Sequence, residues 1–209
     1  MLPPASRAAR VRIFPMFRTI LLSIFIALSF ATVSAQQPRP SPVAVPVGLA
    51  WINGAPANAG FTILMPGKPT EQVQPVAGHP DLENHLLALE TSLASYVVSY
   101  LTLADDVTDP AIIKVLLDRG REDGLTSSGG TLKSEKEITL NKYFGREWLI
   151  ELPGGFSATA RAYWVKRRLF QTVFITTPEP DDSAEVKRLR QETATKFLDS
   201  FTLSDDTGN

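Results

Sequence analysis

No feature constrains the fold of this chain more than a run of four candidate strands in its second half, at residues 131–140, 146–152, 157–166 and 168–176. The turn Pro153-Gly154-Gly155 separates the second strand from the third. The basic run Lys166-Arg167-Arg168 forms the turn between the third and the fourth. Strands joined by turns this short are antiparallel neighbours. The second half of the chain therefore predicts an antiparallel sheet.

Further strands are expected nearer the N-terminus. Phe61, Ile63 and Met65 recur at period two, which predicts a strand with these side chains on one face. Two β-rich runs follow and are separated by a short polar connection, at residues 86–91 and 96–103. This arrangement predicts a hairpin.

A helix is predicted between the two groups of strands. Asp109 has the character of an N-cap, and Pro110 follows at the first helical position, where its missing N–H is not needed. Gly120 or Gly124 is expected to end the helix. The polar segment 127–130 is then expected to be a loop.

A second helix is predicted near the C-terminus. It begins at Asp182 or Ser183, and Asp182 and Glu185 have the spacing of a capping box. An apolar stripe follows at steps of three or four residues: Val186, Leu189, Thr193, Phe197 and Phe201. Such a stripe indicates a helix that packs on a sheet.

The order of elements is strands, helix, four strands, helix. This order predicts an α+β domain with a mainly antiparallel sheet of six to seven strands, packed by two amphipathic helices. The helices lie either both on one face of the sheet or one on each face. A single domain fits the length of the chain.

The N-terminus has the pattern of a secretory signal peptide. A positive region contains Arg7, Arg10, Arg12 and Arg18, an apolar run at residues 20–31 follows, and Val33-Ser34-Ala35 has the small residues of a cleavage site. The apolar run is shorter than the roughly 20 residues that span a bilayer. We expect cleavage after Ala35 and no stable membrane span afterwards. Translation starts at Met1 or Met16.

These signals divide the chain into four parts. Residues 1–35 are the signal peptide, 36–57 a proline-rich linker, 58–204 the folded domain and 205–209 a polar tail. An exported protein of this kind is expected to be periplasmic or extracellular.

Composition excludes several classes of function. The chain has no cysteine, which rules out disulfides, thiol catalysis, thiolate metal sites and lipid attachment through a cysteine. Because four of its 21 basic residues precede residue 36, the mature chain has 17 basic and 22 acidic side chains, a net charge of −5. An acidic chain without a basic cluster argues against nucleic acid or an anionic membrane as partner.

The candidate site consists of Arg146, Glu147, Arg161 and Tyr163, on two strands that the turn at Gly154 makes antiparallel neighbours. If residues whose numbers add to about 309 face each other, Glu147 lies opposite Ala162 and diagonal to Arg161 or Tyr163. This register predicts a cross-strand ion pair. The alternative is that the four residues form the floor of a site for an anion or a partner.

Other side chains give weaker signals for chemistry. His79 and His85 lack the spacing of metal ligands, and neither a nucleophile-elbow nor a P-loop motif occurs. Glu147 and Glu151, four residues apart on one strand, are about 13 Å apart, too far for glycosidase chemistry. We expect no metal and no cofactor. Four aromatic residues lie either in the core or on a recognition surface: Trp148, Trp164, Phe170 and Phe174.

Short motifs over residues 58–203 resemble those of a group of exported bacterial proteins. These motifs are Phe61-Thr62-Ile63-Leu64-Met65-Pro66-Gly67-Lys68-Pro69, Tyr96-Val97-Val98-Ser99-Tyr100, Gly145-Arg146-Glu147, Arg161-Ala162-Tyr163-Trp164-Val165, Arg168-Leu169-Phe170-Gln171 and Phe197-Leu198-Asp199-Ser200-Phe201. The element order resembles the PsbP-like and DcrB-like α/β/α sandwich. That resemblance implies an antiparallel sheet between helices and an accessory or binding role, with no shared catalytic site.

The sequence therefore favours a non-enzymatic exported domain that binds an envelope protein or a small ligand. Two alternatives remain open. One is a ligand carrier or enzyme whose site is built from scattered Arg, Glu and Tyr residues, and the other is a structural component of the envelope.

Overall fold

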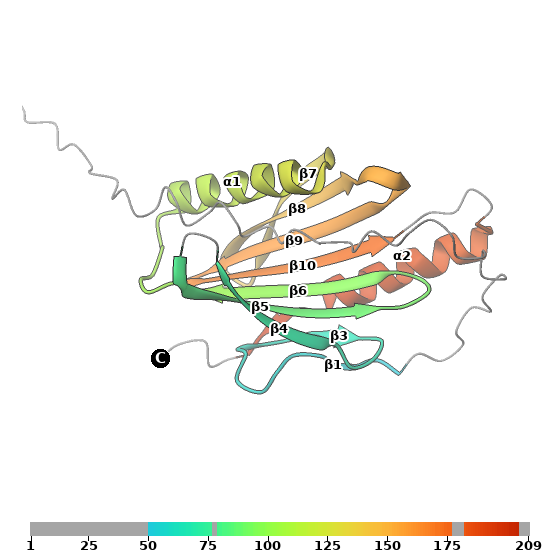
Figure 1. Ribbon diagram of the computed structural model, residues 1–209, viewed down its shortest axis with the longest axis horizontal. Coiled ribbons are helices and arrows are strands. Elements are labelled where there is room, and N and C mark those ends of the chain that lie inside the picture. Colours follow the sequence, from blue (N-terminus) through green and yellow to red (C-terminus); the bar gives the residue numbers. More distant parts are fainter. Residues whose placement is uncertain (1–49, 77–78, 177–181, 205–209) are drawn as a thin grey trace, which may run out of the picture.

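The computed structural model describes residues 50–76, 79–176 and 182–204. The signal peptide, most of the linker and the polar tail expected from the sequence lie outside these ranges. Within them, seven strands form one sheet, called the main sheet (Figure 1), in the order β4 (Thr70–Val76), β5 (His79–Glu90), β6 (Ser95–Thr102), β10 (Arg168–Thr176), β9 (Ser157–Val165), β8 (Tyr143–Glu151) and β7 (Thr131–Leu140). All of its neighbouring strands pair antiparallel.

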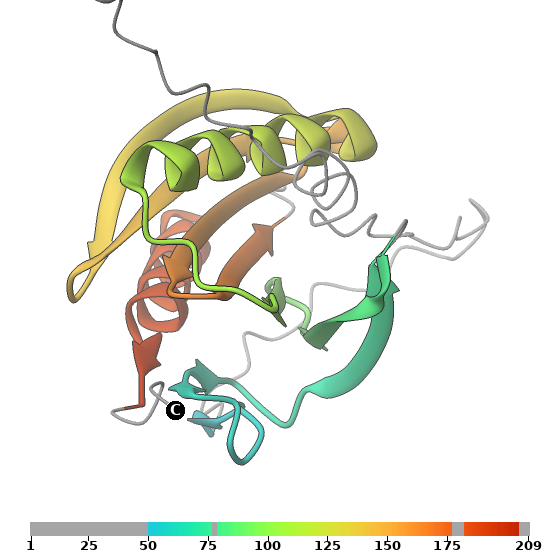
Figure 2. The ribbon, with the colours of Figure 1, turned by 90° about the vertical axis from the view of Figure 1, so that its left-hand side faces the viewer.

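Helix α1 (Pro110–Ser128) and helix α2 (Ala184–Asp199) cover opposite faces of the main sheet, as Figures 1 and 2 show. α1 packs against β8, and α2 packs against β10. We call the two sides the α1 face and the α2 face. The α+β fold predicted from the sequence is confirmed, and one helix lies on each face.

The chain path explains why β6 and β10 meet in the middle of the main sheet. β4, β5 and β6 follow one another as hairpins, and α1 then leads to β7 at the opposite edge. β8, β9 and β10 return by successive hairpins until β10 pairs with β6. The predicted hairpins are confirmed. β4 was not predicted, because its sequence is largely polar and exposed.

Alternation along the strands gives the main sheet two buried layers. Trp148 and Trp164 belong to the α1 face, whereas Tyr96, Phe170 and Phe174 belong to the α2 face, and none of them is more than 3% exposed. The four aromatic residues singled out in the sequence therefore form core on both sides and no shared recognition surface.

Helix α1 is longer than the sequence predicted. Asp109 caps its start, where its side chain accepts a hydrogen bond from the Ala111 N–H. The helix continues through Gly120 and Gly124, which are buried on its inner side, and ends before Gly129, whose φ of 65° is left-handed. Ser127 and Ser128 belong to its last turn and not to a loop, so the C-terminal end of α1 reaches over the α1 face.

The segment before β4 forms a small layer on the α2 face. Its short strands pair outside the main sheet, β1 (Ile52–Asn53) with β3 (Leu64–Met65) and β2 (Phe61–Thr62) with β11 (Thr202–Leu203). Phe61, Ile63 and Met65 are buried together as predicted, but not as one strand of the main sheet. Because β1 lies within residues 36–57, packed structure begins inside the expected linker.

Candidate functional site

The four residues expected to form a site lie on both faces of the main sheet. Arg146 and Glu147 are adjacent on β8, so their side chains point to opposite sides. The observed register pairs Glu147 with Arg161 and Gly145 with Tyr163, one residue from the predicted register. Glu147, Arg161 and Tyr163 therefore share the α2 face, and Arg146 lies apart from them on the α1 face.

Arg146 joins the strands to α1. Its guanidinium lies 3.7 Å from a carboxylate oxygen of Asp118 on α1 and 3.3 and 3.4 Å from those of Glu135 and Glu137 on β7. The residue is 7% exposed. We call Arg146, Asp118 and Glu135 the α1 clamp, because they connect this helix to the edge of the main sheet.

Glu147 and Arg161 make the predicted cross-strand ion pair. Arg161 Nε donates to Glu147 Oε2 at 2.6 Å, and Arg161 Nη1 donates to Asp199 Oδ1 at the end of α2 at 2.7 Å. Lys136 Nζ lies 2.8 Å from the other oxygen of Glu147. Glu147, Arg161 and Asp199 form the α2 clamp, which connects α2 to β8 and β9.

The charges of the α2 clamp hold one another ionised. Burial acts to raise the pKa of Glu147, but hydrogen bonds and charges from Lys136 and Arg161 outweigh it and lower that pKa. Burial likewise acts to lower the pKa of Arg161, and its bonds to Asp199 and Glu147 raise it. Because Arg161 is already engaged by two carboxylates, it does not offer an open fork to an anion.

Tyr163 serves the core of the α2 face. It is 5% exposed, and its ring stacks on Phe201 with centroids 5.7 Å apart and an interplanar angle of 2°. Burial raises the pKa of its phenol. The side chain thus packs the end of the sheet against the residues that follow α2.

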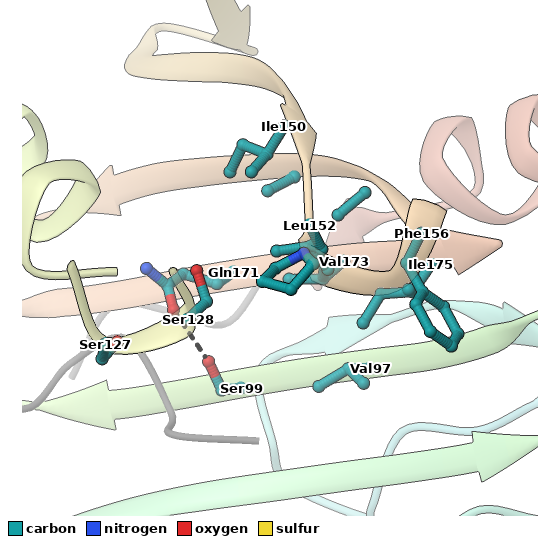
Figure 3. A pocket seen from close by; sticks show the side chains of 13 residues that line it. Val97, Ser99, Ser127, Ser128, Ile150, Leu152, Phe156, Gln171, Val173 and Ile175 are labelled. Carbon is teal, nitrogen blue, oxygen red and sulfur yellow. Dashed lines mark hydrogen bonds between the residues drawn. The ribbon is translucent and has the colours of Figure 1, made fainter. Parts of the chain in front are cut away.

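A hollow of about 320 Å³ opens on the α1 face (Figure 3). It lies between the C-terminal end of α1, the turn after β8 and the surface of β6, β10, β9 and β8. The described residues that line it are Val97, Ser99, Ser127, Ser128, Ile150, Leu152, Pro153, Phe156, Ala158, Ala160, Gln171, Val173 and Ile175, and none is charged. Ligand pockets measure roughly 300 to 1,000 Å³ and are mostly apolar, so the hollow has the character of a small one.

Small side chains create the hollow. Ala158 and Ala160 on β9 and Ser99 on β6 project little from the α1 face, while α1 packs against β8 to one side. Pro153, in the turn that follows β8, lies against Gly129 at the end of α1, and the ring of Phe156 borders the hollow on the same side. The space over β6 and β10 therefore stays unfilled by these elements.

A pair of polar side chains lies in the floor of the hollow. Ser99 and Gln171 face each other across β6 and β10, and the Ser99 hydroxyl donates to Gln171 Oε1 at 3.1 Å. They are 4% and 6% exposed. No acceptor among the described residues binds the amide N–H groups of Gln171.

The hollow has a polar end and an apolar end. Figure 3 shows Ser99 and Gln171 at one end and Phe156 and Ile175 at the other. Since Gln171 and Ile175 are four residues apart on β10, the ends are about 13 Å apart. An elongated molecule with one polar group matches this arrangement.

Sequence reasoning missed the hollow, although a signal for it was present. Ala158 and Ala160 alternate on β9, where large apolar residues would be usual for a covered strand. Ser99 and Gln171 interrupt the apolar alternation of β6 and β10 at positions that turned out to be paired. The signal has meaning only once the register places these residues together.

The histidines form no metal centre. His85 stacks on Tyr100 with centroids 4.6 Å apart, and its ring nitrogens lie 3.8 and 3.9 Å from Glu71 and Glu83. Across the described ranges, no group of three or more His, Asp or Glu side chains is placed to hold a metal ion. No described helix has the length and apolar composition needed to cross a bilayer.

Comparison with known proteins identifies the fold. No family model and no curated protein match the chain. Among solved structures, it is similar to the solution structure of cyanobacterial PsbP (CyanoP) from Synechocystis sp. PCC 6803, with a TM-score of 0.52 and 14% identity over 78% of this chain and 98% of that chain. The PsbP-like fold expected from the sequence is confirmed. At this identity the likeness shows the fold alone.

Proposed function

We propose that this protein is an exported, non-enzymatic binding domain whose ligand site is the hollow on the α1 face. The observation that carries the proposal is a formed cavity of about 320 Å³ over the middle of the main sheet, lined by apolar side chains and a few polar ones. Cavities of this kind are the usual sites for small ligands. The absence of charged groups among its described lining residues favours binding over acid–base chemistry.

The test is to fill the hollow. Ala160→Leu extends a side chain into the cavity, while Ala184→Leu makes the same change at an exposed position on α2. An uncharged naphthylamine fluorophore should bind the mature wild-type protein and the Ala184→Leu control with equal affinity. Binding to Ala160→Leu should be at least about tenfold weaker. Equal fluorophore binding by all three proteins would contradict the proposal.

Export is proposed from the N-terminal pattern. Its test is the N-terminus of the protein recovered from a bacterial host that expresses the full chain with a C-terminal tag. Cleavage after Ala35 predicts a mature protein that begins at Gln36 outside the cytosol. Recovery of cytosolic protein with residues 1–35 attached would refute export and would leave the binding proposal to its own test.

An accessory protein that binds an envelope protein is the second candidate. Ile112 and Val115 lie three residues apart on α1 and are 46% and 63% exposed, so the helix carries an apolar spot on its outer side. A photo-crosslinker at Val115 in intact cells should then capture a defined protein that one at exposed Gln191 on α2 does not. Identical products from both positions would reject this candidate.

A further inference from the structure

We infer that the hollow selects an uncharged, elongated, mostly apolar molecule that carries a hydrogen-bond acceptor at one end. This inference rests on the proposed binding function and adds the chemical class of the ligand. The acceptor meets the amide N–H of Gln171, and the apolar part lies along β10 toward Phe156 (Figure 3).

Gln171 presents a hydrogen-bond donor to the hollow. It is 6% exposed, and its oxygen is occupied by the Ser99 hydroxyl at 3.1 Å. A carboxamide has two N–H donors besides its oxygen. Because that oxygen is already used, what Gln171 presents to the hollow is a donor to which no described protein group is bound. A ligand with a carbonyl or ether oxygen accepts this hydrogen bond in place of water.

The lining excludes charge. A carboxylate or ammonium transferred from water into an apolar pocket needs an opposite charge nearby. On the same face, the guanidinium of Arg146 is already paired with Asp118 and Glu135 in the α1 clamp. None of the described lining residues supplies a counter-charge. The site therefore favours a neutral acceptor, such as an ester or a ketone, over an acid or an amine.

The shape of the hollow determines which apolar part the ligand can have. Beyond Gln171 the floor consists of Val173, Ile175, Ala158 and Ala160, and Phe156 closes the far end. These side chains offer no directional bond, so they select by volume and apolar area. A flexible alkyl chain or a narrow ring on the side opposite the acceptor fits over them.

The experiment uses three probes of matched size on the mature protein. Methyl hexanoate has the neutral acceptor, octane is its apolar counterpart in a saturated solution, and hexanoate carries a charge. Binding is measured by two-dimensional nitrogen–proton NMR, in which the Gln171 side-chain amide is assigned by triple-resonance experiments on the wild-type protein and checked by its loss in Gln171→Leu. Gln191→Leu, at an exposed position of α2, is the control.

We expect methyl hexanoate to bind more tightly than octane and hexanoate and to shift the Gln171 amide signal. In Gln171→Leu its affinity should fall about threefold to tenfold while octane binding does not weaken, and Gln191→Leu should leave both unchanged. If Gln171→Leu does not fold, the shift of the amide signal in the wild-type protein decides between the outcomes.

Octane binding as tightly as methyl hexanoate, or hexanoate binding best, would overturn this inference and leave the binding function standing. No perturbation of the lining residues by any probe would overturn the binding function itself.

Discussion

The two faces of the main sheet are anchored alike and filled differently. On both, an arginine and two carboxylates connect a helix to the strands, with Arg146 buried in the α1 clamp and Arg161 half-buried in the α2 clamp. The α2 face is then closed by aromatic rings, with Phe170 and Phe197 fully buried. On the α1 face, the buried surface over the middle strands consists partly of alanine, serine and glutamine side chains, and a hollow remains above them. The comparison indicates that packing on the α2 face contributes more to the stability of the fold, whereas the α1 face is packed incompletely and contains a cavity.

Removal of a large side chain should separate the two faces most clearly. Phe197→Ala should lower the free energy of unfolding by about 3 to 5 kcal/mol, because Phe197 is fully buried and contacts Tyr96 at a centroid distance of 5.3 Å. Phe156→Ala, at the end of the hollow, should cost about 1 to 2 kcal/mol because its ring is only half-buried. Urea denaturation measures both. Equal losses would break the comparison.

Loss of either clamp should matter to a similar degree. Arg161→Ala leaves Asp199 without its cation and leaves Glu147 with Lys136 alone, and it should cost about 1 to 2 kcal/mol because Asp199 is exposed to solvent. Arg146→Ala should cost about as much on the α1 face. Arg188→Ala is the control, since its ion pair with Glu192 is exposed and should be worth less than about 0.5 kcal/mol. If Arg161→Ala were as mild as the control, the α2 clamp would not anchor α2.

The α2 clamp should also give stability a pH dependence. The folded pKa of Glu147 is lowered, so its contribution is complete above the ordinary carboxyl value of 4.5 and is lost as the pH falls through the lower folded value. Glu147→Gln should therefore cost about 1 to 3 kcal/mol at neutral pH, and the difference from wild type should shrink in acid. Thermal unfolding at a series of pH values tests this. A difference independent of pH would show that the charge of Glu147 does not matter.

The smallest effect is expected from filling the hollow. Ala160→Leu places new atoms in empty space and should change stability by less than about 1 kcal/mol. Ala162, two residues further along the same face of β9, is fully buried. Ala162→Leu should therefore lower the free energy of unfolding by about 1 to 3 kcal/mol through overpacking. Thermal unfolding distinguishes the pair. A loss for Ala160→Leu as large as for Ala162→Leu would mean that no usable space lies over Ala160.

Prediction from the sequence succeeded where signals were local. Hairpin turns identified β8, β9 and β10, and Asp109 and Pro110 identified the start of α1. β4 was missed because Glu71, Gln72 and Gln74 give an edge strand no apolar alternation. The predicted register of β8 with β9 was wrong by one residue, because the turn at Pro153–Gly155, in which Gly154 and Gly155 have positive φ, is not a simple two-residue hairpin.

The candidate site was harder to predict than the fold. Arg146 and Glu147 were grouped with Arg161 and Tyr163 because the two strands are antiparallel neighbours, but consecutive residues on a strand point to opposite faces. The ion pair of Glu147 with Arg161 was predictable, because it depends on two neighbouring strands. The partners Asp199 and Asp118 were not, since they come from helices whose positions the pattern leaves open.

The sequence by itself determined the α+β class, the antiparallel strands and the amphipathic helices, because period, turns and caps act over a few residues. Only the tertiary structure decided that the helices lie on opposite faces, that the segment before β4 packs on the α2 face, and that a cavity remains on the other. A cavity is the space that several elements fail to fill. Its existence depends on the register of β6 with β10 and on the position of α1 over β8, and both are set by packing between residues far apart in the chain.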